Sequence, residues 1–290
     1  FSNKCSYCAI PLIRGKMRSR KMENIIEEAK KFAENGVKEL VIVAQDVTAY
    51  GIDLYKKYAL PDLLKELCKI DGIKWIRLLY CYPERMTDEL IETIKTEDKV
   101  LNYIDIPIQH CNKEILRNMY RGGDEQSLRE LFAKLRREIP GVVLRTTLIT
   151  GFPGETEEQF SELAEFVNDI KFERLGCFAY SAEEDTPAAE MPDQVDEGER
   201  QRRADIITSE QEIRMGEYYA GMVGNTYEVV CEGFDRYSDM YFGRSMHFAP
   251  EIDGMIYFTS AKDKSSLTIG DFVNVKITDV LENNLLGERV

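Results

Sequence analysis

The chain has no run of apolar residues long enough to cross a membrane. No stretch of its 290 residues approaches the ~18 to 20 consecutive apolar residues of a transmembrane helix, and no secretory signal peptide is visible. Hydrophobic residues make up 43% and charged residues 31% of the chain, which is ordinary for a soluble globular protein. We therefore expect no membrane partner, and one large core or a large and a small domain.

Positive charge is also scarce. The net charge of −14 argues against a protein that coats nucleic acid, because phosphate binding needs clustered Lys and Arg. One basic segment precedes the first acidic residue, Glu23; it contains Lys4, Arg14, Lys16, Arg18, Arg20 and Lys21. Composition alone favours a solvated face over an anion site for this segment.

The cysteines lack the pattern of a disulfide framework. There are seven, an odd number, at positions 5, 8, 68, 81, 111, 177 and 231. This scatter suggests a reducing, cytosolic setting, in which the CSYC motif of Cys5 and Cys8 binds a metal or carries out redox chemistry. We interpret the other five cysteines as small apolar core residues.

The CSYC motif alone leaves several chemistries open. A structural zinc site normally has four Cys or His ligands, but no second CxxC exists, and His110 and His247 are isolated. A thioredoxin-like motif would lie at a strand-to-helix junction, whereas the residues after Cys8 read as an irregular basic loop. An iron–sulfur cluster fits better, since thiolates are its normal ligands.

The order of elements predicts an α/β fold. Amphipathic helices are expected at 21–36, 60–72, 87–95, about 112–119, 124–138 and 156–169, and strands at 38–46, 74–83, 101–109, 142–154 and 174–181. Alternation with repeats of roughly 30 to 40 residues indicates parallel strands with helical crossovers, as an open sheet or a partial barrel. Ligands gather at the carboxyl ends of such strands, where polar groups such as Gln45, Asp46, Tyr82 and Gln109 fall.

The last part of the chain has a different character. An acidic loop at 183–195 and a charged helix at about 196–220 lead into five short alternating strands separated by turn residues. About 70 residues of this kind predict a small all-β, OB-like barrel. We therefore divide the chain into 1–195, a helical linker at 196–220, and a β-barrel at 221–290.

Four segments, in this order, resemble one enzyme family. They are CSYCAIPLIRGKMRSR from Cys5, VIVAQDVTAYG at 41–51, YIDIPIQHCNKEILRNMYRGG at 103–123 and LRTTLITGFPGETEEQF at 144–160. Together they resemble the radical S-adenosylmethionine (SAM) methylthiotransferases, and the final segment resembles their TRAM module. The resemblance implies a partial (βα)6 TIM-like barrel followed by a TRAM barrel, a 4Fe–4S cluster and S-adenosylmethionine as cofactors, and transferase activity.

The resemblance also implies site residues. Cys5 and Cys8 match two of three cluster ligands in the spacing C-x3-C-x2-C, and the third position is occupied by Phe1. The remaining assignments are to the cofactor: Gln45 and Asp46 near its methionyl end, Gln109 at a strand end, and Arg145, Gly151, Phe152, Pro153 and Gly154 beside its nucleoside. From the residues alone, a strand-terminal turn, an internal salt bridge and a simple glycine turn remain open for these positions. The resemblance identifies no further catalytic residue.

Two substrates occur in the resembling family, an adenosine of transfer RNA and an aspartate of small-subunit ribosomal protein twelve. The segments IDIPIQH at 104–110 and YFGRSMHFAPEIDGMIYF at 241–258 resemble the ribosomal-protein type. Residues 221–290 carry eleven acidic against six basic side chains, which suits a basic protein better than RNA. We therefore expect methylthio transfer to the β-carbon of an aspartate, with a basic ribosomal protein and an electron donor as partners. A transfer-RNA enzyme and a non-catalytic binding fragment without a cluster are the alternatives.

The resembling family normally carries an amino-terminal domain whose own three cysteines hold a second 4Fe–4S cluster. No other cysteine triad is visible in this sequence, so the second cluster is expected in that domain and not in residues 1–290. The resemblance therefore implies a fragment, from which sulfur insertion is not expected alone.

The occupant of position 1 generates a first prediction. We expect residues 1–290 to form no stable 4Fe–4S cluster after anaerobic reconstitution, because phenylalanine does not ligate iron and two thiolates leave the cluster labile. Iron and sulfide analysis measures the outcome. A folded sample that retains about four irons per chain would contradict the prediction.

Overall fold

The amino-terminal part of the chain forms a five-stranded parallel sheet flanked by helices. The computed structural model describes residues 4–260 and 266–290. The strands β1 (Glu39–Ile42), β2 (Trp75–Leu78), β3 (Val100–Asp105), β4 (Val143–Thr150) and β5 (Arg174–Ala179) lie in sequence order, and every neighbouring pair is parallel. This confirms the predicted α/β partial barrel, with five strands within the described residues.

Helices alternate with these strands. They are α2 (Met22–Glu34), α3 (Ile52–Tyr55), α4 (Leu60–Cys68), α5 (Asp88–Thr96), α6 (Lys113–Asn118), α7 (Glu125–Glu138) and α8 (Glu157–Ile170). Local sequence explains two of the starts, since Asp124 with Ser127 and Thr156 with Gln159 form reciprocal capping boxes at α7 and α8. The apolar faces of these helices share one core with the sheet, through side chains such as Phe132 and Phe166.

The segment after Cys8 differs from the expected irregular loop. Residues Ile10–Arg14 form the short helix α1, with Pro11 in its first turn and Gly15 after its end at a φ of 74°. Proline lacks an N–H that would be unpaired in a first turn, and glycine adopts positive φ without strain. The two residues that suggested a loop therefore delimit a helix, none of whose residues is buried.

The strands are shorter than the apolar patterns predicted. β1 stops at Ile42, because Asp46 caps the 3-10 helix η1 (Val47–Ala49) by accepting a hydrogen bond from the Ala49 N–H. β2 stops at Leu78, and the backbone turns at Tyr80, whose φ is 61°. The apolar residues past these two ends differ, since Val43 after β1 is exposed, whereas Leu79 and Cys81 after β2 are buried.

The carboxyl-terminal strands close into a barrel. The strands β6 (Thr226–Asp235), β7 (Met240–Arg244), β8 (Ile256–Thr259), β9 (Phe272–Leu281) and β10 (Asn284–Arg289) follow the order β10-β8-β7-β6-β9. All neighbouring pairs are antiparallel except β8 with β10. Closure leaves no free sheet edge, and the predicted small β-barrel is confirmed.

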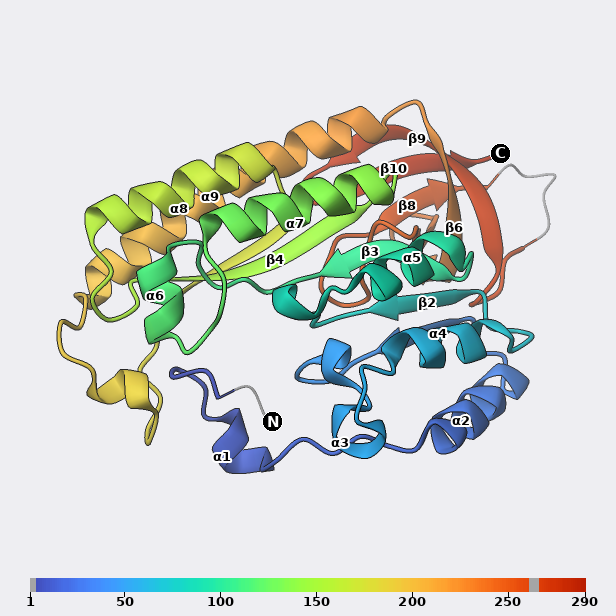
Figure 1. Ribbon diagram of the computed structural model, residues 1–290. Coiled ribbons are helices and arrows are strands. Elements are labelled where there is room, and N and C mark those ends of the chain that lie inside the picture. The colour runs from blue at the N-terminus through green and yellow to red at the C-terminus, as the bar shows by residue number, and fades with distance from the viewer. Residues whose placement is uncertain (1–3, 261–265) are drawn as a thin grey trace.

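The long helix α9 (Glu197–Met222) connects the sheet to this barrel. Ile207 packs into the core of the sheet, whereas Tyr219 and Met222 belong to the core of the β-barrel. Figure 1 shows α9 running alongside β4 before the chain enters the red barrel strands. The division at 195 and 220 stays a prediction. Among the described residues, no helix is long and apolar enough to cross a bilayer.

The β-barrel contacts the amino ends of the parallel strands. Glu39, at the start of β1, accepts hydrogen bonds from Arg77 of β2 and from Arg244 of β7, each at 2.7 Å. Both arginines are at least 95% buried. Asp253, in the loop after β7, accepts a hydrogen bond from the Tyr103 hydroxyl at 2.7 Å. The carboxyl ends of the strands therefore remain open at the opposite side, near α1 (Figure 1).

Glu39 generates a stability prediction. Glu39→Gln leaves two buried guanidinium groups without their shared charge, and we expect a loss of about 3 kcal/mol in unfolding free energy, measured by urea titration. The matched control is Glu228→Gln, because Glu228 also joins the two parts of the chain but pairs with Lys74 in an exposed ion pair. The control should cost less than about 1 kcal/mol. Equal losses for both variants would contradict this prediction.

Candidate active site

A cavity of about 430 Å³ opens at the carboxyl edge of the parallel sheet. Its wall combines the cysteine loop with the segments after three neighbouring strands; Gln45 follows β1, Tyr80 follows β2, and Gln109 follows β3. The volume lies within the ~300 to 1,000 Å³ typical of small-molecule sites. The location at the strand ends matches the ligand sites of other parallel α/β folds.

Cys5 and Cys8 both line this cavity as free thiols. A tight turn joins them, in which the Cys8 N–H donates to the Cys5 carbonyl at 3.1 Å. Ser6 anchors the turn, since its hydroxyl donates to the Asn118 carbonyl at 2.7 Å and its N–H donates to the Met119 carbonyl at 3.1 Å. The structure therefore places both predicted iron ligands side by side at the strand ends.

The two thiols have different surroundings. Burial raises the pKa of the Cys8 thiol, so a positively charged ligand is what would hold it as a thiolate. On the other side, Arg121 lies 3.8 Å from the Cys5 sulfur, donates to the Pro107 carbonyl at 2.7 Å and stacks on the Tyr82 ring. The position predicted for a third ligand, Phe1, lies outside the described residues.

Gln109 supplies an unused hydrogen-bond acceptor. Its backbone is fixed in a left-handed conformation, φ 71°, by bonds to Thr147 and Ile149 of β4. Its side-chain oxygen is buried and has no hydrogen-bond partner among the described residues. A buried amide oxygen without a partner costs free energy. The cavity therefore offers a polar ligand an acceptor as well as two thiols, which fits an iron-bound cofactor with amino and hydroxyl donors.

Gln45 and Asp46 both line a cavity of about 850 Å³ beside α1, but only Gln45 also lines the cysteine cavity. Gln45 is exposed and lines the cavity with the cysteines. The Asp46 carboxylate is buried, accepts from the Thr48 hydroxyl and the Ala49 N–H, and pairs with Arg85. Its predicted cofactor contact stays a prediction, and its observed partners are those of a strand-terminal turn.

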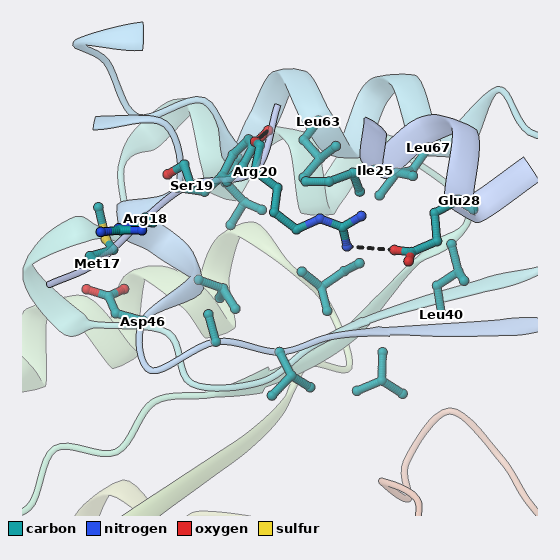
Figure 2. A pocket seen from close by; sticks show the side chains of 18 of the residues that line it. Met17, Arg18, Ser19, Arg20, Ile25, Glu28, Leu40, Asp46, Leu63 and Leu67 are labelled. Carbon is teal, nitrogen blue, oxygen red and sulfur yellow. Dashed lines mark hydrogen bonds and ion pairs between the residues drawn. The ribbon is translucent and has the colours of Figure 1, made fainter. Parts of the chain in front are cut away.

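Asp46 also lines a further cavity, of about 330 Å³, between α2, α4 and β1. Figure 2 shows Asp46 below Met17 and Arg18, whereas Arg20 extends across the mouth towards Glu28. The Arg20–Glu28 ion pair measures 2.7 Å. Part of the basic segment thus forms a rim over an apolar cavity floor.

Arg145 lies inside the sheet and not in the cavity wall. Its guanidinium donates to the Asp105 carboxylate at 2.8 Å, and the Asp105 side chain is 1% exposed. The other oxygen of Asp105 accepts the Tyr80 N–H at 2.9 Å. Arg145 is therefore connected to the cavity only indirectly, by hydrogen bonds through Asp105 to Tyr80. Its predicted contact with the nucleoside stays a prediction.

The glycine-rich turn at 151–154 packs against α9. A Cβ added to Gly151 would lie 2.4 Å from the Arg200 side chain, so glycine permits the close approach of that helix. Phe152 is fully buried against Tyr180, with ring centroids 5.5 Å apart. Pro153 is buried, and the Gly154 N–H donates to the carbonyl of Asp193. None of the four lines the cysteine cavity, and their contact with a nucleoside stays a prediction.

Sequence reasoning missed a buried carboxylate beside this turn. Glu155 accepts the Gly151 N–H at 3.0 Å and the Arg203 guanidinium at 2.8 Å. His110 lies 3.5 Å away through Nε2, while its Nδ1 accepts the Asn112 N–H, which places the proton of the neutral ring on Nε2. Burial by itself would raise the pKa of Glu155, but His110, Gly151 and Arg203 hold it below its usual range. Only its place in the GFPGE motif signalled this role.

Comparison with known proteins places the chain in a family. The model of the radical SAM superfamily matches residues 2–167. The chain belongs to the radical SAM superfamily. A TRAM domain model matches residues 223–290, which contain the closed β-barrel.

Curated relatives are identical to this chain at half of the aligned positions. The protein named "Ribosomal protein uS12 methylthiotransferase RimO" of Clostridium botulinum strain Hall is 50% identical over 286 residues, which cover 99% of this chain and 63% of the relative. The protein of the same name from Caldanaerobacter subterraneus subsp. tengcongensis is also 50% identical, with 99% and 64% covered. The chain thus spans less than two thirds of the length of these relatives.

Solved structures support the fold. The radical S-adenosylmethionine methyltransferase TsrM of Kitasatospora setae, with cobalamin and a [4Fe-4S] cluster bound, aligns with a TM-score of 0.52 at 17% identity over 64% of this chain and 36% of that chain. Streptococcus suis SuiB bound to S-adenosylmethionine aligns with a TM-score of 0.50 at 16% identity over 73% and 45%. At such identities the likeness concerns the radical SAM fold.

Glu155 generates a prediction about acid stability. Because its folded-state pKa lies below the unfolded value of about 4.3, ionised Glu155 stabilises the fold above that pH, and the contribution is lost as the pH falls through the folded pKa. Glu155→Gln should therefore lower Tm at pH 7 and flatten the fall of Tm between pH 7 and acid. The control Glu157→Gln, which removes an exposed partner of Arg203, should keep the wild-type slope. Parallel curves for the wild type and Glu155→Gln would contradict the prediction.

Proposed function

We propose that the chain is the radical SAM and TRAM portion of a methylthiotransferase that modifies the β-carbon of an aspartate in small-subunit ribosomal protein uS12. The observation that carries the proposal is 50% identity, over 99% of the chain, to relatives named for that activity. The cavity supports the proposed cluster chemistry, because both cysteines line it at the strand ends. The alternative substrate, transfer RNA, has no comparable support.

Cys5 and Cys8 would supply two of the three thiolates of a 4Fe–4S cluster. When bound, the cluster supplies the electron for reductive cleavage of S-adenosylmethionine, and the chain's own residues bind and orient the reactants. Gln109 would accept a hydrogen bond from the cofactor, since its buried oxygen has no partner among the described residues. Gln45, in the same wall, would contact the cofactor from the other side. The second cluster belongs, in this proposal, to a segment outside residues 1–290.

Residues in the wall of the cysteine cavity would also exclude water from the site of the reaction. Tyr82 and Pro107 form part of the wall, and the Arg121 guanidinium covers the Tyr82 ring at 4.2 Å. Burial in this wall also raises the pKa of the Cys81 thiol well above its ordinary value, so Cys81 stays neutral. A largely apolar wall beside the cysteine turn would protect a reactive carbon radical from side reactions.

A basic protein substrate is supported by charge near the cavity. Residues 183–197 carry seven acidic side chains and no Lys or Arg. This loop is tied to the cysteine turn, since the Ala188 N–H donates to the Ser6 carbonyl at 2.9 Å. All seven are exposed: Glu183, Glu184, Asp185, Glu190, Asp193, Asp196 and Glu197. A ribosomal protein would be steered to this edge by complementary charge, and the reaction would take place in the cytoplasm with a one-electron donor.

The direct test uses the full-length protein, reconstituted with iron and sulfide without oxygen, with purified uS12, S-adenosylmethionine and a reductant. Mass spectrometry of uS12 should show one methylthio group on an aspartate. Cys5→Ser and Cys8→Ser should reduce product to background and bound iron by about half, because each removes a ligand of only one of the two clusters. The control Cys68→Ser changes a half-buried thiol on α4 and should leave both unchanged. Modification of transfer RNA in place of uS12 would overturn the proposal.

A further inference from the structure

Two residues in the wall of the cysteine cavity have left-handed backbones. Tyr80 has a φ of 61° and Gln109 a φ of 71°. An aromatic residue in this region is a genuine outlier, and the conformation costs about 1 to 3 kcal/mol. Lys56 and Lys171 share the conformation, but they end helices, where it is common. Tyr80 and Gln109 instead follow strands and line one cavity.

Three hydrogen bonds hold the backbone at Tyr80. Its N–H donates to the Asp105 carboxylate at 2.9 Å, and its carbonyl accepts the Val47 N–H at 3.1 Å. The next N–H, that of Cys81, donates to the Asp105 carbonyl at 2.8 Å. The second carboxylate oxygen of Asp105 is held by Arg145 at 2.8 Å. The strained conformation is therefore fixed from β3 and β4.

The strain leaves an aromatic side chain unengaged at the cavity. Tyr80 is 43% exposed, whereas its neighbour Cys81 is 1% exposed. No hydrogen bond, ring contact or cation contact involves the Tyr80 side chain within residues 4–260 and 266–290. Tyr82, two positions on, is covered by the guanidinium groups of both Arg85 and Arg121. Tyr82 thus has cationic partners within the chain, whereas Tyr80, in the same wall, has none among the described residues.

We propose that Tyr80 contacts the protein substrate, its ring receiving a Lys or Arg side chain that flanks the target residue, and that Asp105 and Arg145 are positioning residues. The inference rests on the proposed function, which makes the substrate a basic protein. A half-exposed tyrosine ring attracts a cation through its π face. The acidic loop 183–197 brings such a chain to the same edge of the sheet, and Tyr80 gives one cation a defined place beside Cys5 and Cys8.

The test measures peptide binding without turnover. The probe is a fluorescent peptide with one aspartate flanked by lysines and arginines, titrated by anisotropy with the full-length reconstituted protein in the absence of reductant. Tyr80→Gly removes the ring, and glycine adopts the observed φ without strain, so the fold should keep or raise its Tm. Binding should weaken about fivefold. Tyr80→Phe keeps the π face and should bind as the wild type does.

The control is Tyr58→Gly. Tyr58 is 42% exposed, almost as much as Tyr80, but it does not line the cysteine cavity. Its replacement should leave peptide affinity unchanged. A second peptide, with glutamine in place of each flanking basic residue, should bind the wild type and Tyr80→Gly equally.

The positioning role has a separate readout. Arg145→Gln should weaken peptide binding about twofold in the wild-type background. It should cause no further loss in the Tyr80→Gly background, because both substitutions affect the same contact, that of the Tyr80 ring with the peptide. Undiminished binding by Tyr80→Gly, or additive losses in the double variant, would overturn the inference. Failure of the proposed function would look different, since the wild type itself would then neither bind nor modify the basic substrate.

Discussion

The ion pair between Asp105 and Arg145 determines the shape of the edge at which the site lies. Parallel strands end at one edge of a sheet, and their backbone N–H groups lose their partners where the strands diverge. Asp105 supplies acceptors there: one carboxylate oxygen takes the Tyr80 N–H, and its carbonyl takes the Cys81 N–H. Arg145 balances the buried charge from the next strand. The ends of β2 and β3 are thereby tied to each other and to β4, and the cavity opens beside them.

Carboxylate–arginine ion pairs also connect elements at two other places in the fold. Glu155 binds the glycine turn after β4 to Arg203 of α9, and Glu39 binds β1 and β2 to Arg244 of the β-barrel. In each case one buried carboxylate has partners on two different elements. Loss of one partner leaves a buried charge unpaired, which makes these connections specific as well as stable. The edge that carries the cysteines thus belongs to a sheet that is held by α9 and by the β-barrel.

Much of the scaffold could be predicted from the sequence. The alternation of amphipathic and apolar segments indicated all five parallel strands, and turn residues marked the five strands of the barrel. The pattern also placed polar residues such as Gln45 and Gln109 at the strand ends, whereas the position of Cys5 and Cys8 beside them comes from the structure. Local signals were sufficient wherever neighbouring residues determine the structure.

The parts that the sequence did not reveal depend on distant partners. Glu155 and Arg203 are 48 positions apart, and neither has a local pattern that indicates burial. The strained Tyr80 follows an ordinary apolar strand, and its conformation is imposed by Asp105, 25 positions further on. Helix α1 was read as a loop because Pro11 and Gly15 serve as helix boundaries as readily as turn residues.

The central claim is that the cysteine edge receives both cofactor and basic substrate. Hydrogen–deuterium exchange of the full-length protein, with and without uS12, tests it most directly. We expect added protection at residues 5–15, 80–82 and 183–197, which surround the open edge. Protection confined to residues 226–289, at the far end of the fold, would contradict it.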